Sequence, residues 1–210
     1  MKIKFFLAAL AAMLLSGAVV SAQTPEEIVK QMGAQLERCN AEGFSMDFIM
    51  KMPILGTVRS HYMVLGKKMK ASFASSDKNV VSWYDETTEW TYDSRDNTLT
   101  VENRKPSSAD GNESHLKEFD SLRDGYDFKL QKETPEAWYI LCKRSRSNKD
   151  KDDPKSMELA VAKATYLPVY IRSKKPLFSF AIENVIPGVT EESVTFRPEA
   201  YSNAQVVDKR

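Results

Sequence analysis

The stretch 79–103 constrains the fold most, because polar residues alternate with apolar or aromatic ones through three short segments. These segments are 81–84, 89–92 and 98–101, and turns rich in Asp, Asn, Ser and Thr separate them. A period of two places alternate side chains on opposite faces of a strand, and β-branched and aromatic residues suit a half-buried sheet surface. Strands this close in sequence pair antiparallel. We therefore expect a chain built around an antiparallel meander.

The N-terminus has the pattern of a secretory signal peptide. Lys2 and Lys4 precede an apolar run over 5–20, and the small residues Ser21 and Ala22 follow it. The run is shorter than the roughly 20 residues that span a bilayer, which argues against the alternative of an uncleaved anchor. We expect cleavage after Ala22, an exported periplasmic protein, and one domain over 23–210.

Charge and cysteine content narrow the function classes. The 30 basic and 29 acidic residues nearly cancel, so there is no overall electrostatic case for binding nucleic acid or an anionic membrane. Cys39 and Cys142 are the only cysteines, and they do not form a Cys-x-x-Cys motif. Export makes a disulfide between them chemically possible, while two separate buried thiols are the alternative.

The mature chain should open with an amphipathic helix. Thr24 and Glu27 form a capping box around Pro25, and Gly43 supplies a stop. Ile28, Met32 and Leu36 follow at helical spacing with Val29 and Cys39. This apolar face is expected to pack across the concave side of the sheet.

The remaining pattern predicts further strands. Together with the meander they make about eleven, at 44–52, 57–65, 68–75, 126–131, 137–144, 157–161, 169–171 and 177–185. We expect a short helix within 112–122 and an extended tail over 194–210. The fold class is thus mainly β with a few helices.

Signatures of catalysis are missing from the sequence. His61 and His115 are the only histidines, and no second ligand stands at metal-binding spacing from either. A Gly-x-Ser-x-Gly nucleophile elbow and a phosphate-cradling glycine loop are also absent. We expect a protein that is not an enzyme and that uses no metal or cofactor.

The segment 44–52 indicates an adaptable apolar surface. Its alternation should turn Phe48 and its alternate neighbours inward, and Asp47 and Lys51 toward solvent. Methionine is common there, and it suits surfaces that accommodate varied apolar shapes, although plain core packing is the alternative. One main helix cannot cover so much apolar sheet, so we expect a cavity for an oily ligand. Its candidate lining is Met32, Leu36, Phe44, Met46, Phe48, Met50, Met69, Trp90, Tyr92 and Phe180, with Met52 at the end of the strand.

Three stretches together resemble the LolA family of periplasmic lipoprotein carriers. The first is a signal peptide and opening helix followed by a Phe44-x-Met46-x-Phe48 strand and a hairpin centred on Gly66. The second is the pair 80–84 and 89–92, with Trp and Tyr in each strand. The third is the ending, with Phe196-Arg197-Pro198 followed by Val206-Val207-Asp208. The resemblance covers 24–210 and lies in the order and spacing of the stretches.

The resemblance implies an incomplete antiparallel β-barrel whose helices form a lid over an apolar cavity. It implies a carrier that shields the acyl chains of lipoproteins, receives them from an inner-membrane releasing transporter and delivers them to an outer-membrane acceptor. The family's Arg-Pro pair, in which the Arg helps to hold the lid shut, is missing. Lys67 and Lys68 stand in that region, and lysine lacks the planar fork of arginine. The turn glycine before the Trp/Tyr strand is absent too.

Two other function classes stay open. A sensing module similar to RseB-type half-barrels would bind lipid or lipoprotein and act on a signalling partner, but those proteins carry a second domain. A lipid hydrolase would need a nucleophile and base that the sequence does not supply. Acyl species that co-purify with the protein would discriminate between these classes.

Overall fold

A single sheet dominates the computed structural model, which describes residues 23–54, 56–74, 79–104, 125–151, 153–175 and 178–210. The strand order is β12-β6-β5-β4-β3-β2-β1-β11-β10-β9-β8-β7. The strands are β1 (Phe44–Met52), β2 (Gly56–Leu65), β3 (Lys68–Ala74), β4 (Asn79–Tyr84), β5 (Thr88–Asp93), β6 (Thr98–Asn103), β7 (Tyr126–Glu133), β8 (Ala137–Arg144), β9 (Ser156–Ala162), β10 (Pro168–Lys174), β11 (Ser179–Pro187) and β12 (Gln205–Asp208). The sheet is not closed, because β7 and β12 end the order without pairing to each other, and a half-open barrel is therefore confirmed.

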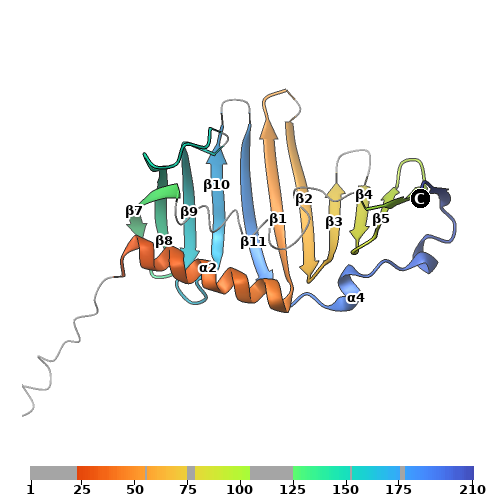
Figure 1. Ribbon diagram of the computed structural model, residues 1–210, viewed down its shortest axis with the longest axis horizontal. Helices are drawn as coiled ribbons and strands as arrows, with labels where there is room; N and C mark the ends of the chain where they lie inside the picture. The colour runs from red at the N-terminus through yellow and green to blue at the C-terminus, as the bar shows by residue number, and fades with distance from the viewer. Residues whose placement is uncertain (1–22, 55, 75–78, 105–124, 152, 176–177) are drawn as a thin grey trace, which may run out of the picture.

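Two antiparallel meanders make up eleven of the twelve strands of this sheet. Strands β1 to β6 pair in sequence order, as do β7 to β11. The meanders join where β1 pairs with β11, with Phe48 opposite Ile182. Figure 1 shows this join at the middle of the sheet.

The twelfth strand corrects the predicted count. Strand β12 lies in the tail expected to be merely extended, and it pairs parallel with β6, placing Val206 opposite Leu99. The tail also contains helix α4 (Glu191–Val194) and a 3₁₀ turn, η1 (Pro198–Tyr201), neither of which was predicted. The helix predicted within 112–122 lies outside the described residues, and so does His115.

Helix α2 (Pro25–Glu42) begins and ends where the sequence predicts. The Thr24 hydroxyl accepts a hydrogen bond from the Glu27 backbone N–H at 3.2 Å, and the Glu27 carboxylate accepts one from the Thr24 N–H at 2.9 Å. The chain turns at Gly43, whose φ of 80° suits glycine. A β-carbon there would lie 2.8 Å from the carbonyl oxygen of Val189.

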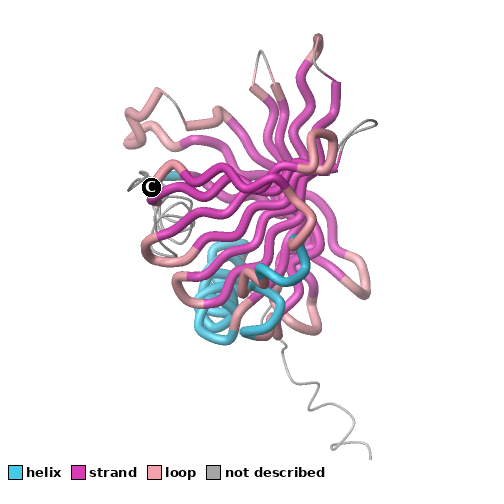
Figure 2. Tube along the Cα trace, turned by 90° about the vertical axis from the view of Figure 1, so that its right-hand side faces the viewer, coloured by secondary structure: helices cyan, strands magenta, loops and turns pink. Residues whose placement is uncertain are grey.

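The apolar side of α2 forms the core with strands β7 to β10. In Figure 1 the helix crosses the lower ends of these strands, and Figure 2 shows the helices gathered at this end of the sheet. Ile28 and Met32 are at most 1% exposed. Each such side chain contributes about 1.5–3 kcal/mol through burial. The core cluster is Ile28, Val29, Met32, Leu36, Tyr126, Ile140, Cys142, Met157, Leu159, Val161 and Ile171.

The two cysteines are free thiols, and both are buried. Cys142 belongs to the core cluster, and its burial raises the pKa of the thiol to about 12. The thiol is therefore protonated at neutral pH. The structure therefore contains two separate buried thiols and not a disulfide between Cys39 and Cys142.

Candidate functional site

The pairing register defines the side of the sheet on which α2 lies. Ile171 belongs to the core beneath α2, and it pairs with Ile182 of β11. Ile182 pairs with Phe48, Phe48 with Ser60, and Ser60 with Phe73. Residues directly opposite each other in antiparallel strands share a face. We call this side, from Ile171 to Phe73, the helix face.

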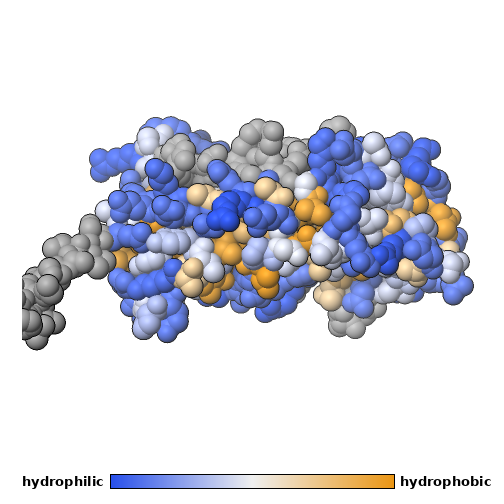
Figure 3. Space-filling view, turned by 90° about the horizontal axis from the view of Figure 1, so that it is seen from below, coloured by the Kyte–Doolittle hydropathy of each residue, from blue (hydrophilic) through white to orange (hydrophobic). Residues whose placement is uncertain are grey.

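Beyond α2, the helix face carries half-buried aromatic and methionine side chains. The rings of Phe48 and Phe180 stack with their centroids 6.2 Å apart, and Tyr62 meets Phe73 edge to face at 6.1 Å. The register adds Met50, which lies opposite Phe180. The other half-buried members are Phe44, Met46 and Met69. In Figure 3 orange apolar surface shows between blue polar side chains at the end of the sheet where α2 and α4 lie.

Most of the predicted lining residues thus lie on one face, but Met32 and Leu36 have a different place. These two side chains pack in the core beneath α2 and are at most 5% exposed. They therefore belong to the buried core next to the helix face and do not form part of its accessible surface. Sequence reasoning missed Tyr62 and Phe73, although the alternation in their strands could have identified them.

Trp90 and Tyr92 were predicted to line the cavity with these residues, but they lie on the other side of the sheet. Val80 is on the helix face because it pairs with Phe73, so Val81 and Trp83 point the other way. Trp90 pairs with Trp83 and Tyr92 with Val81. We call this side the opposite face. Alternation fixes which residues share a face but not which face they are on, and both faces of β4 and β5 carry large side chains.

The C-terminal segment packs against these aromatic residues. Phe196 stacks on Trp90 with ring centroids 5.1 Å apart and meets Trp83 at 5.4 Å. Tyr201 lies 4.7 Å from Tyr92. The ending that contributed to the family resemblance therefore fastens the tail to the sheet.

Lys67 and Lys68, the predicted lid latch, each meet a carboxylate. Lys67 lies 3.0 Å from Glu86 in the neighbouring turn, and Lys68 pairs with Glu191 of α4. Lys68 thus links the β3 strand to the C-terminal segment.

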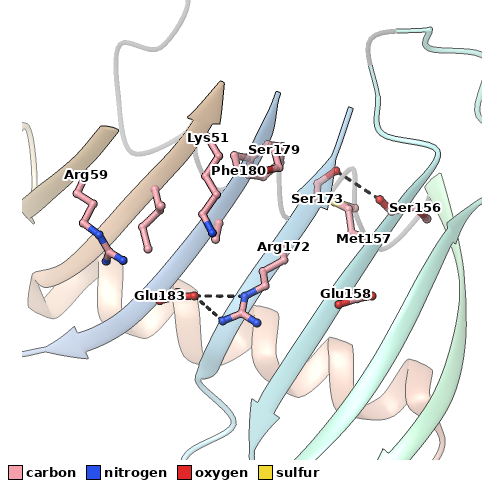
Figure 4. A pocket seen from close by; sticks show the side chains of 12 residues that line it. Lys51, Arg59, Ser156, Met157, Glu158, Arg172, Ser173, Ser179, Phe180 and Glu183 are labelled. Atoms are coloured by element: carbon pink, nitrogen blue, oxygen red, sulfur yellow. Dashed lines mark hydrogen bonds and ion pairs between the residues drawn. The ribbon is translucent and has the colours of Figure 1, made fainter. Parts of the chain in front are cut away.

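A hollow of about 590 Å³ is lined mainly by residues of the opposite face, many of them charged, and also by Met157, Ser173 and Phe180 of the helix face. Ile49 and Ala181 lie at its base, and Figure 4 shows Lys51, Arg59 and Arg172 around it. Two nitrogens of Arg172 donate hydrogen bonds to one oxygen of Glu183, at 2.6 and 3.2 Å.

Asp47 lies on the same opposite face and is not simply solvated. One of its oxygens forms a 2.7 Å hydrogen bond with Nδ1 of His61, and the other accepts one of 2.7 Å from Asn184. Burial opposes ionisation of Asp47, but these hydrogen bonds outweigh it and hold its pKa below the usual range.

Within the described part of the chain, no group of three or more His, Cys, Asp or Glu residues could hold a metal ion. The described helices include none with the length and apolar character to cross a membrane. The helix face is thus a broad apolar surface beside a packed helix, and a row of charged residues that includes Arg59, Arg172 and Glu158 lies on the reverse side.

Comparison with known proteins identifies the fold. No family model matches the chain, and no curated protein matches it in sequence. Among solved structures, LprF from Mycobacterium bovis matches with a TM-score of 0.53 at 8% identity, over 82% of this chain and 96% of that one. The two proteins therefore share a fold.

Two further structures match with lower scores. An uncharacterized conserved protein from Thermus thermophilus has a TM-score of 0.48 at 16% identity, over 89% of this chain and 100% of the other. A LolA superfamily protein from Nitrosomonas europaea has a TM-score of 0.35 at 8% identity, over 85% and 100%.

Proposed function

We propose that this protein is an exported, non-enzymatic carrier that binds the acyl chains of lipoproteins on its helix face. The observation that supports it most is the set of half-buried Phe, Tyr and Met side chains there, around the Phe48–Phe180 stack. These side chains supply apolar area with few hydrogen-bonding groups. An acyl chain gains about 0.8 kcal/mol for each buried CH₂, so contact area alone gives affinity.

The carrier would work in the periplasm, between an inner-membrane transporter that releases lipoproteins and an outer-membrane acceptor. Such a role needs binding that is strong but reversible. Methionine side chains such as Met46 and Met50 adapt to different acyl shapes without demanding one geometry. No covalent chemistry is required, because transfer follows from competition for the chain.

A displacement experiment tests the proposal. A fluorescent apolar probe should bind the purified protein, and a diacylated peptide should displace it while the same peptide without acyl chains should not. Equal displacement by both peptides would show a peptide-binding module and would contradict the proposal.

A charge on the helix face should weaken acyl binding. In the Phe48→Glu variant, an acyl chain that covers position 48 must desolvate a carboxylate, so we expect affinity for the acylated peptide to fall at least about tenfold. Ile186→Glu is the matched control, because Ile186 is 59% exposed and pairs with Ser45 on the opposite face. The proposal fails if Phe48→Glu binds like the wild type while remaining folded by circular dichroism.

A further inference from the structure

The hollow on the opposite face is built from one cross-strand row. Arg59 of β2 pairs with Ile49 of β1, and Ile49 pairs with Ala181 of β11. Ala181 pairs with Arg172 of β10, and Arg172 with Glu158 of β9. The row therefore runs from a cation, over two apolar residues, to a second cation and a carboxylate. Figure 4 shows these charged side chains on the side of the sheet away from α2.

Of the cations in this hollow, Arg172 is already engaged. Its guanidinium contacts Glu183 and also lies over the ring of Tyr170, 3.9 Å from the centroid. Both contacts fix its orientation. Arg172 therefore forms one wall of the hollow, and its guanidinium is less available than the other cations to bind a ligand.

Lys51 and Arg59 are different. Both are exposed. Neither forms an ion pair or a hydrogen bond within the described residues, although the charge of Arg59 helps to lower the pKa of its diagonal neighbour Asp47. Lys51 pairs with Thr57, two residues from Arg59, so the two cations are diagonal neighbours on adjacent strands. Cα atoms in such positions lie about 7–8 Å apart. Like charges so close repel each other, and an anion held between them would remove that cost.

The apolar base of the hollow also favours the binding of an anion. Ile49 is only 5% exposed, although it lies on the face away from α2. An apolar base limits the water around an anion seated above it, so each charge–charge contact is worth more than in bulk solvent. Arginine also offers a planar fork for two oxygens of one group, and lysine adds a point charge.

We propose that this hollow is an anion site, in which Lys51 and Arg59 bind a phosphate group. The group can come from free phosphate or from the head group of a phospholipid. Lys51 and Arg59 lie on the face opposite to the proposed acyl site, although Phe180 of the helix face also lines the hollow.

The test uses the full mature chain and two probes. Inorganic phosphate is titrated by calorimetry at low salt, and sedimentation is measured with vesicles of phosphatidylcholine alone or mixed with phosphatidylglycerol. Binding of inorganic phosphate assigns a free anion, and binding only to the phosphatidylglycerol vesicles assigns a head group. Either result should weaken as salt rises, because both cations are exposed.

The double variant Lys51→Gln/Arg59→Gln should lose at least about tenfold in affinity for whichever probe binds. Lys129→Gln on β7 is the control, since Lys129 is exposed and lies outside the hollow. Saturable binding to neither probe, or equal loss in the control, would overturn the proposal.

Discussion

At the residue scale, the sequence of β1 predicts the face on which Asp47 lies but not the residues to which it is hydrogen-bonded. Alternation correctly turns it away from Phe48, because neighbouring side chains on a strand point to opposite faces. Its partners could not be predicted in this way. His61 belongs to the next strand, and Asn184 comes from β11, far along the chain, at a φ of 56°.

This site predicts a pH dependence. Because the pKa of Asp47 is lower in the folded protein, its stabilising effect is present above the pKa of the unfolded carboxyl, about 3.9, and disappears as pH falls through the folded value. The Asp47→Asn variant should therefore unfold more easily at pH 7 and lose less stability below about pH 4. The side chain is 31% exposed, so the difference at pH 7 should be about 0.2–1 kcal/mol.

Urea unfolding between pH 3 and pH 7 measures this effect. Asp127→Asn serves as the control, because Asp127 is exposed on β7 and has no hydrogen bond or ion pair within the described residues. Parallel curves for the wild type and Asp47→Asn would show that the carboxylate contributes no pH-dependent stability.

At the element scale, α2 and β1 were predicted with nearly correct bounds because their signals are local. The capping box fixes the start of α2, and the alternation of 44–52 fixes the whole of β1. The partners of these elements are not local. Nothing in the residues of β1 specifies pairing with β11, and nothing in the tail specifies a parallel strand beside β6.

Removing the cap of α2 should destabilise the protein measurably. Thr24→Ala deletes the oxygen that accepts the Glu27 N–H, at a cost of about 1 kcal/mol. For a chain of this size the melting temperature should fall by about 2–4 °C. Thr24→Ser keeps an oxygen in place and should melt close to the wild type. If all three proteins melt together, the first turn of α2 contributes nothing to global stability.

At the scale of the whole molecule, the C-terminal segment ties distant parts of the sheet together. It leaves the centre at β11, where the Gly188 N–H donates to the carbonyl of Gly43 at 2.9 Å. It then contacts β2 and β3 through α4 and reaches the far edge as β12. Figure 1 shows it along the lower right border of the sheet. The sequence predicted the Trp/Tyr strands and the tail as separate features, and their contact appears only in three dimensions.

Phe196 is the anchor of this segment. Phe196→Ala removes the ring that stacks on Trp90 and meets Trp83, so we expect a loss of about 2 kcal/mol in unfolding free energy. Tryptophan emission should shift to the red as the indole rings gain water. Arg197→Ala alters the neighbouring exposed residue and should leave the emission unchanged. An unshifted spectrum in Phe196→Ala would mean that the tail does not shield the tryptophans.

The join between β1 and β11 also bears on how the chain folds. Each meander brings together strands that are neighbours in sequence, whereas this join must bring together segments from near the two ends of the described chain. Closing so long a loop costs entropy before any contact repays it, which slows folding. We therefore expect the halves to gain structure first and the Phe48–Ile182 pairing to form last. In pulsed hydrogen exchange, the amides of β4 and β5 should become protected before those of β1 and β11, and the reverse order would place the nucleus at the join.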